Sequence, residues 1–186
     1  MTLENQLFRI DINIDDAFSV EDGSSQGYDY CYNPHAYNDP DYSKVFSIHV
    51  YQQNRQYKIA LIGNINSYDD HCAVLEGNLL TVLQGWDVLQ FNVESAELLK
   101  VCRIDSWTCN YAIYRVKDGY VIHGETDITM LDERLQKMWS FSGYDIFESV
   151  TGKKPFEIKE DRICLYDFCD NYYEIDFNGN VILSTV

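Results

Sequence analysis

The chain has 186 residues, of which 30 are acidic and 14 are basic, so its formal net charge at pH 7 is −16. This charge excludes a conventional nucleic-acid-binding protein, which needs a basic surface, and disfavours adhesion to an anionic membrane. The hydrophobic fraction of 46% can build a core, but no apolar run has the length that crosses a membrane. The first residues lack the basic and apolar regions of a secretory signal, so we expect a cytoplasmic protein.

Residues 1–66 predict an N-terminal sheet. Apolar and polar residues alternate over 8–14, which is the period of a half-buried strand. Two further apolar segments flank a polar turn at 52–56 and indicate a hairpin. The strands expected in this sheet are 7–14, 28–32, 44–51 and 57–63.

The stretch Tyr28–Tyr42, YDYCYNPHAYNDPDY, holds five tyrosines and three aspartates and no Lys or Arg. Tyrosine is enriched at binding hot spots, and the aspartates would steer a cationic partner. The alternative is a loop that covers the sheet, with buried rings and solvated carboxylates. The residues predicted to contact a partner are Tyr30, Tyr32, Tyr37, Asp39, Asp41 and Tyr42.

Three segments of the second part of the chain repeat one pattern of four strands joined by tight turns. They share the motif (Asp/Asn)-x3-apolar-(Asn/Asp), whose copies start 40 and 44 residues apart. A four-stranded unit of about 40–45 residues is typical of a β-propeller blade. The segments are 71–106, 107–148 and 155–186, and the motifs start at Asp87, Asp127 and Asn171.

The stretch DGYVIHGETDITMLDERLQKMWSFS, within the second segment, resembles blades of the quinoprotein-like and WD-type propeller families. The resemblance covers residues 71–186 and concerns architecture. The chain departs from the WD pattern because Trp86-Asp87 lies at another place in its blade. It departs from the quinoprotein pattern because Arg134 and Ala96 occupy turns that carry glycine there.

These observations together predict a single all-β domain over residues 1–186. Three blade-like units of about 42 residues and the N-terminal sheet would form an antiparallel meander. Either a small closed propeller or an open, curved sheet or sandwich fits this pattern. Only Glu94–Val101 and Asp145–Val150 are candidates for a helix, of one or two turns each.

Catalytic constellations are sparse in this sequence. His123, Glu125 and Asp127 would share one face of a strand, where paired carboxylates can perform acid–base chemistry if burial separates their pKa values. A small hydrolase or ligand-binding β domain built on these residues is therefore an alternative function. The chain contains no phosphate-binding loop, serine-hydrolase elbow, zinc-protease or dinucleotide-binding motif.

Metal sites and cofactors are not expected. The six cysteines lack the C-x2-C spacing of structural zinc sites, and we expect reduced thiols. Cys31 and His35 form C-x3-H without a second pair. A calcium-loop template fits only in part, at Asp11, Asn13, Asp15 and Asp22, and lacks the required glycine and the final glutamate.

In charge and composition the chain resembles the immunity proteins of bacterial polymorphic toxin systems, and it shares the look of bacterial β-repeat proteins. The first resemblance implies a non-enzymatic, acidic protein-binding module that neutralises a basic partner by presenting carboxylates where phosphates would bind. A propeller-like scaffold for peptide binding is a second alternative. The acidic protein-binding module and the hydrolase or ligand-binding domain differ in the salt dependence of their binding, since binding through exposed charges weakens steeply as salt rises.

Overall fold

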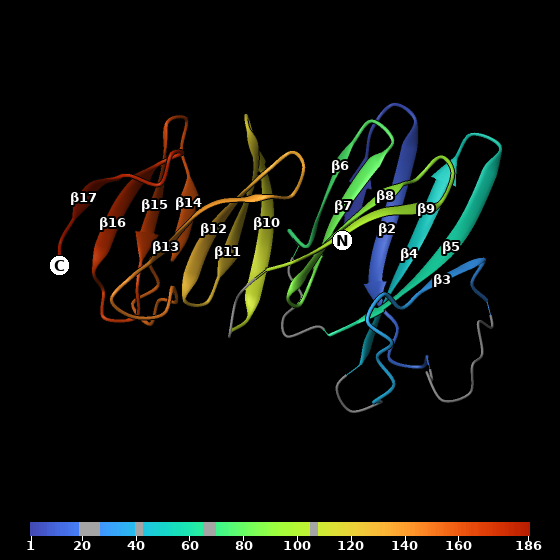
Figure 1. Cartoon of the computed structure of the whole chain (residues 1–186), viewed down its shortest axis with the longest axis horizontal. Coiled ribbons are helices and arrows are strands. Elements are labelled where there is room, and N and C mark those ends of the chain that lie inside the picture. Colours follow the sequence, from blue (N-terminus) through green and yellow to red (C-terminus); the bar gives the residue numbers. More distant parts are fainter. Residues whose placement is uncertain (19–26, 40–42, 65–69, 105–107) are drawn as a thin grey trace. The chain divides into compact units, whose positions relative to one another are not determined.

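The computed structural model describes residues 1–18, 27–39, 43–64, 70–104 and 108–186. These residues form seventeen β-strands and no helix, which confirms the predicted all-β fold (Figure 1). The chain divides into two compact units, residues 1–105 and residues 106–186. Within the described residues, no helix has the length and apolar character needed to cross a membrane.

The N-terminal sheet has five strands, whose order in the sheet is β1-β2-β4-β5-β3. They are β1 (Thr2–Glu4), β2 (Phe8–Ile14), β3 (Tyr30–Tyr32), β4 (Lys44–Gln52) and β5 (Arg55–Gly63). Neighbouring strands are antiparallel, except that β3 runs parallel to β5. The β4–β5 turn is shorter than predicted, because cross-strand pairing continues to Gln52 and Arg55.

Three four-stranded antiparallel sheets follow, each a meander in chain order, as the repeats predict. The first comprises β6 (Ala73–Glu76), β7 (Leu79–Gln84), β8 (Asp87–Asn92) and β9 (Glu97–Arg103). The second comprises β10 (Asn110–Val116), β11 (Gly119–Gly124), β12 (Asp127–Asp132) and β13 (Lys137–Ser142). The third comprises β14 (Phe156–Ile158), β15 (Arg162–Tyr166), β16 (Tyr172–Asp176) and β17 (Val181–Ser184).

The repeated motif has a physical role at the turn between the third and fourth strands of each meander. Its last residue, Asn or Asp, accepts backbone N–H groups of the turn through a side-chain oxygen, at distances of 2.7–3.3 Å. Such side-chain caps stabilise turns without help from other segments. Asn92 accepts from Glu94 and Ser95. Asp132 accepts from Arg134 and Gln136. Asp176 accepts from Asn178 and Asn180.

These turns also contain a residue with positive φ, which glycine adopts most easily. Gly179 has φ +82°, but the other two turns use Ala96 at φ +61° and Leu135 at φ +57°. The left-handed residue of the second turn is therefore Leu135, the neighbour of Arg134. The Leu135 side chain is buried, and this burial offsets the backbone strain.

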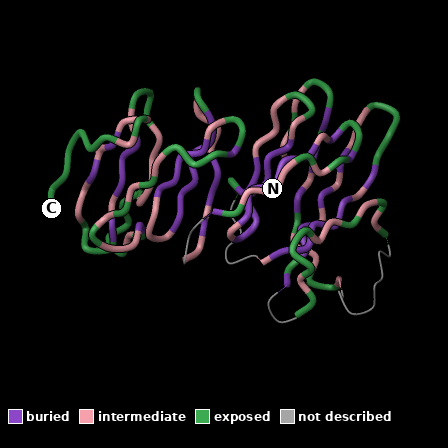
Figure 2. The backbone as a smooth tube through the Cα atoms, in the orientation of Figure 1, coloured by how far each residue is buried: buried purple, intermediate pink, exposed green. Residues whose placement is uncertain are grey.

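The core of residues 1–105 lies between the N-terminal sheet and the β6–β9 sheet. Ile10, Ile48 and Leu61 from the first sheet belong to one buried cluster with Leu80 and Phe91 from the second. Figure 2 shows the buried residues following the inner strands, while the hairpin turns are exposed. Alternation of side chains along each strand supplies these apolar faces.

The core of residues 106–186 lies between the β10–β13 and β14–β17 sheets. Val121 and Met130 contribute from the first sheet, and Leu165 and Tyr173 from the second. Phe147, from the segment that connects the two sheets, is fully buried in the same cluster. Each unit therefore has its own two-sheet core.

Three hydrogen bonds fasten the N-terminal sheet to the β8–β9 turn. Three backbone carbonyls of this turn accept hydrogen bonds from side chains of β3 and β5, and we name the group the carbonyl clasp. Its donor and acceptor pairs are Tyr57 with Val93, Arg55 with Glu94 at 3.1 Å, and Tyr32 with Ala96 at 2.5 Å. The clasp satisfies carbonyls that face away from their own sheet.

Both helix candidates are wrong. Residues 94–96 form the capped turn described above, and Glu97–Arg103 pairs with β8 as strand β9. The segment Asp145–Val150 also lacks helix, because its backbone bonds to other segments instead. Phe147 N–H donates to the Glu125 carbonyl at 2.6 Å, and Phe168 N–H donates to the Ile146 carbonyl at 2.8 Å.

The close approach of β11 and β12 at Gly119 predicts a severe effect of any side chain there. A Cβ atom on Gly119, at φ +153°, would lie 2.0 Å from the Leu131 carbonyl oxygen. Gly119→Ala should therefore lower the free energy of unfolding by about 3 kcal/mol or more. Gly152→Ala is the matched control, because Gly152 also has positive φ but has no atom within 4 Å of the added Cβ. It should cost about 1 kcal/mol, and equal midpoints of urea unfolding for the two variants would contradict the expectation.

The carbonyl clasp predicts that Tyr32 acts on stability. Tyr32→Phe keeps the ring and leaves the Ala96 carbonyl without its donor, so the free energy of unfolding should fall by about 1 kcal/mol. Tyr144→Phe is the control, because Tyr144 is 73% exposed and should tolerate the loss of its hydroxyl. Chemical unfolding monitored by tyrosine and tryptophan fluorescence measures both, and an unchanged Tyr32→Phe variant would refute the role of the clasp.

Candidate functional site

The tyrosines of strand β3 point into the unit and have internal partners. The Tyr30 hydroxyl accepts a hydrogen bond from Arg55 at 2.9 Å, and its ring meets Tyr57 edge to face. The Tyr32 ring lies edge to face with Phe91, and its hydroxyl belongs to the carbonyl clasp. Both side chains are half-buried, so part of each ring is used inside the protein.

The residues after β3 form a loop that is held in one conformation. The Asn33 side chain accepts a hydrogen bond from Tyr37 N–H and donates one to the Tyr37 carbonyl, both at 2.8 Å. Ala36, between them, has φ +53°, which is uncommon for a residue other than glycine. The Tyr37 ring covers a small apolar cluster around Val45 and Ile62 on the outer face of the sheet. The loop is therefore pre-organised by its own side chains.

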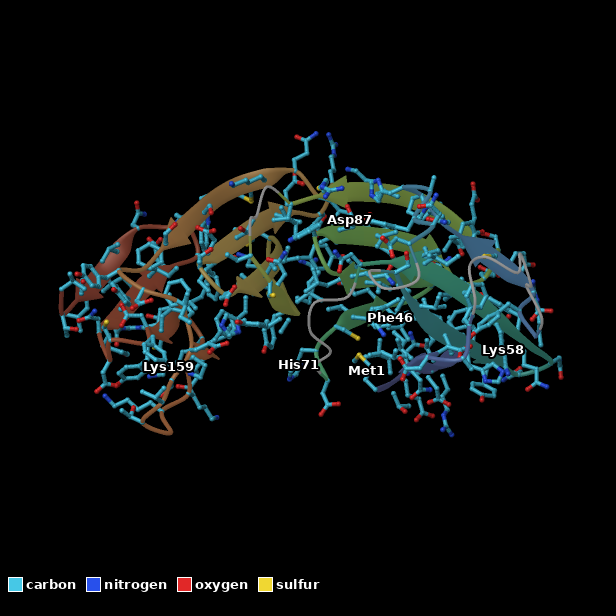
Figure 3. All side chains as sticks on the ribbon, turned by 90° about the horizontal axis from the view of Figure 1, so that it is seen from below. Met1, Phe46, Lys58, His71, Asp87 and Lys159 are labelled. Carbon is cyan, nitrogen blue, oxygen red and sulfur yellow. The ribbon has the colours of Figure 1, made fainter. Side chains whose placement is uncertain are left out.

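A contact between His35 and Asp87 joins this loop to the β6–β9 sheet. His35 Nε2 lies 3.1 Å from Asp87 Oδ1, at the start of β8. Figure 3 labels Asp87 on the ribbon of this sheet. Burial raises the pKa of Asp87 above its ordinary value, and the contact with His35 lowers it by less. His35, which the sequence marked only as half of a C-x3-H pair, thus has a structural partner.

The predicted partner-binding residues therefore differ in their exposure to solvent. Tyr30, Tyr32 and Tyr37 are half-buried, whereas Asp39 is exposed at the end of the loop. Asp41 and Tyr42 lie outside the described residues. The contact of these residues with a partner stays a prediction.

The alternative site at His123, Glu125 and Asp127 does not form the continuous strand face that the sequence predicted. β11 ends at Gly124 and β12 begins at Asp127, so Glu125 lies in the turn between them. Asp127 accepts hydrogen bonds from the hydroxyls of Thr126 at 2.8 Å and Ser142 at 2.5 Å. The tight turn interrupts the alternation, because a reversal of the chain needs residues outside both strands.

His123 is buried among aromatic rings. Its ring stacks on Phe156, with centroids 4.7 Å apart, and meets Tyr111 edge to face. Its Nε2 atom lies 3.3 Å from the Phe147 carbonyl oxygen. These contacts position the imidazole as part of the unit's interior and direct one nitrogen to the backbone.

The sequence does not indicate a cluster of titratable groups that lies next to Glu125. The Tyr111 hydroxyl donates to Glu148 at 2.7 Å, and burial together with this bond raises the pKa of Tyr111. Burial, followed by the charges of Glu125 and Glu148, raises the pKa of the Cys109 thiol. A thiol with a raised pKa stays protonated and is a poor nucleophile, so the cluster does not suit cysteine catalysis. Only cross-strand contacts bring these residues together.

The described residues contain no group of three or more His, Cys, Asp or Glu side chains that could hold a metal ion. Asp11 and Asn13, from the calcium-loop template, alternate within strand β2. None of the six cysteines, all of which lie within the described residues, forms a disulfide. The positions of these side chains follow from strand geometry and burial.

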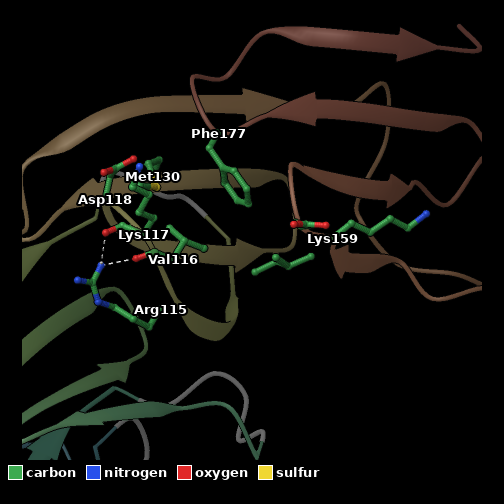
Figure 4. A pocket seen from close by; sticks show the side chains of 9 residues that line it. Arg115, Val116, Lys117, Asp118, Met130, Lys159 and Phe177 are labelled. Atoms are coloured by element: carbon green, nitrogen blue, oxygen red, sulfur yellow. Dashed lines mark hydrogen bonds between the residues drawn. The ribbon is translucent and has the colours of Figure 1, made fainter.

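A shallow groove of about 290 Å³ lies at one end of the β10–β13 and β14–β17 sheets (Figure 4). Met130, Ile158 and Phe177 give it an apolar floor. Arg115 at its edge is already used, because it donates to the Gly119 carbonyl at 2.9 Å and pairs with Glu133 at 2.7 Å. The side chain of Lys159 extends away from the groove (Figure 4). The groove therefore offers apolar contact, and the charged residues Lys117, Asp118 and Glu160 also line it.

No protein-family profile matches this sequence, and no curated protein does. Among solved structures the chain is similar to BamB from Moraxella catarrhalis, with 11% identity, a TM-score of 0.49, and coverage of 77% of this chain and 47% of that one. It is also similar to Hsv2p from Kluyveromyces lactis, with 8% identity, a TM-score of 0.45, and coverage of 75% and 46%. Both are β-propeller proteins. The chain spans about half the length of these structures.

The buried carboxyl of Asp87 predicts a pH-dependent gain of stability on its neutralisation. Its folded pKa is raised above the ordinary value of 3.8, so the ionised form destabilises the fold at neutral pH. Asp87→Asn should raise the free energy of unfolding by about 1 kcal/mol at pH 7, and the difference should vanish as the pH falls towards the unfolded pKa. Thermal melts across pH 4–8 measure this.

His35→Gln is the opposite control for this experiment. It removes the group that offsets the buried charge, so it should destabilise the protein at pH 7 while Asp87→Asn stabilises it. Loss of stability in Asp87→Asn at every pH would show that the contact with His35 outweighs the cost of burial.

Proposed function

We propose that the chain is a non-enzymatic protein-binding module that receives a basic protein partner. Residues 1–105 carry 16 acidic and 6 basic side chains, and residues 106–186 carry 14 and 8. Each compact unit is therefore negative by itself. A field of one sign accelerates the approach of an oppositely charged protein.

The basic side chains are largely occupied by ion pairs, which leave the net charge of each unit unchanged. At least seven of them in the described residues lie within 4 Å of a carboxylate, so their charges are locally neutralised. Such surface pairs contribute little to stability. The unpaired charge that remains on the surface is therefore predominantly negative. The paired residues are Arg9, Lys44, Arg115, Lys153, Lys154, Lys159 and Arg162.

The observation that carries the proposal is the fastened loop after β3. Asn33 and Tyr37 bond to each other, and His35 contacts Asp87, so the loop keeps its shape without a partner. Asn38 and Asp39 are exposed on it. A pre-organised loop loses little conformational entropy on binding, and this favours its use as a recognition element.

The proposal extends to neutralisation of the basic partner's activity. A module of this kind would cover the phosphate-binding surface of a basic nuclease, in the manner of the immunity proteins that the composition resembles. A cytoplasmic location belongs to the same proposal, and six cysteines without disulfides are compatible with a reducing compartment. A basic partner is proposed because the acidic loop and both units have the complementary charge.

Partner capture tests the proposal directly. The immobilised chain is incubated with native lysate and eluted with a salt gradient, and the released proteins are identified by mass spectrometry. We expect a basic protein that leaves at moderate salt, because its contacts are charge-dependent. Binding that persists at high salt would instead favour the alternative of a ligand site or a neutral peptide.

The association rate of the identified partner tests the role of the loop. Asp39→Asn should slow association at low salt and have little effect at high salt, since it removes one exposed charge of the loop. Glu160→Gln, an exposed position in the other unit, changes the net charge equally and should have a smaller effect. Equal effects of the two variants would show that only the overall field matters and would reject the loop as the contact.

A further inference from the structure

The last strand of each four-stranded sheet is an edge strand. In the described sheets this strand is β9, β13 or β17, and it pairs with one neighbour. The backbone N–H and C=O groups on its other side can form hydrogen bonds with a further strand. Natural proteins protect such edges with charged side chains, which are costly to bury between paired strands. The three edges occupy equivalent places in the repeats, so their side chains can be compared directly.

The comparison separates β17 from the other two edges. β9 contains Glu97, Lys100 and Arg103, and β13 begins with Lys137. β17 contains no charged residue, and no charged side chain occurs anywhere in residues 177–186. In a chain with 24% charged residues, this is the edge that lacks the usual protection.

The side chains of β17 are also unusually exposed. All four of its residues are exposed, with Val181 at 52%, Ile182 at 50% and Leu183 at 47%. On β9 the comparable exposed side chain, Leu99, lies next to Lys100 and two residues after Glu97. Three consecutive exposed β-branched or aliphatic residues on an uncharged edge are typical of a strand that another strand covers.

We propose that β17 pairs with β17 of a second copy of this chain, in antiparallel orientation, to form a dimer. Charge selects this occupant. A basic partner would find no side-chain carboxylate along residues 177–186, whereas two copies of a chain with charge −16 repel each other least along a strand without charged side chains. An antiparallel strand pair is related by a two-fold axis, so each copy offers the same surface.

The size and charge of this interface set its behaviour. A strand of four residues buries less area than the interfaces of permanent dimers, so the dimer is weak and in exchange with monomer. Added salt screens the repulsion between the two acidic copies and strengthens the dimer. Binding of a basic partner has the opposite salt dependence, and the two interactions are therefore separable in one set of measurements.

Sedimentation of the full chain over a micromolar to submillimolar range, at low and high salt, tests the proposal. We expect a monomer–dimer equilibrium that shifts towards dimer as salt rises. Leu183→Lys should weaken dimerisation by about tenfold or more, because it places like charges near the two-fold axis. Leu99→Lys is the matched control, since it makes the same change at a side chain of similar exposure, 50%, on β9.

The two variants distinguish pairing through β17 from other modes of association. A dimer that Leu183→Lys disrupts and Leu99→Lys preserves supports pairing through β17. A monomer under all conditions, an equal effect of the two variants, or growth into larger assemblies overturns the proposal. If Leu183→Lys does not fold, hydrogen exchange of the unaltered chain decides, because those amides of β17 that do not bond to β16 must become more protected as the protein concentration rises.

Discussion

Burial of one apolar face from each of two sheets is the constraint on which the structure of residues 1–105 depends. Each buried aliphatic side chain of this core, such as Ile48 or Leu80, contributes about 1.5–3 kcal/mol, whereas a hydrogen bond contributes about 1 kcal/mol. Burial therefore holds the sheets together. The carbonyl clasp adds direction, because its donors on β3 and β5 meet only the β8–β9 turn. Residues 106–186 follow the same principle, with Phe147 completing the core from the connecting segment.

This arrangement gives the tyrosine-rich segment a structural role. Tyr30 and Tyr32 complete the attachment of β3, and Tyr37 covers an apolar cluster on the outer face. Their attachment holds the following loop in place and leaves Asp39 exposed. The proposed basic partner would meet this loop through its exposed carboxylate.

The two proposed interactions use different physical forces at different places. The loop in residues 1–105 would attract a partner by charge, while β17 would pair through backbone hydrogen bonds and apolar side chains where charge is absent. Occupancy of one surface would not require occupancy of the other. Their opposite responses to salt follow from screening, which weakens attraction between unlike charges and weakens repulsion between like ones.

The sequence by itself determined the all-β class, the four-stranded repeats and the approximate bounds of β2, β4 and β5, because alternation and turn residues such as Asp132 act over a few neighbouring positions. It misjudged Glu94–Val101, whose pairing with β8 outweighs its weak helical preference. It also treated His123, Glu125 and Asp127 as one face, although a turn separates them. Only the tertiary structure decided the carbonyl clasp, the contact of His35 with Asp87 and the cluster around Cys109. These depend on which segments meet across sheets, and the cost of burying a charge or an unpaired carbonyl is set there and not by local sequence.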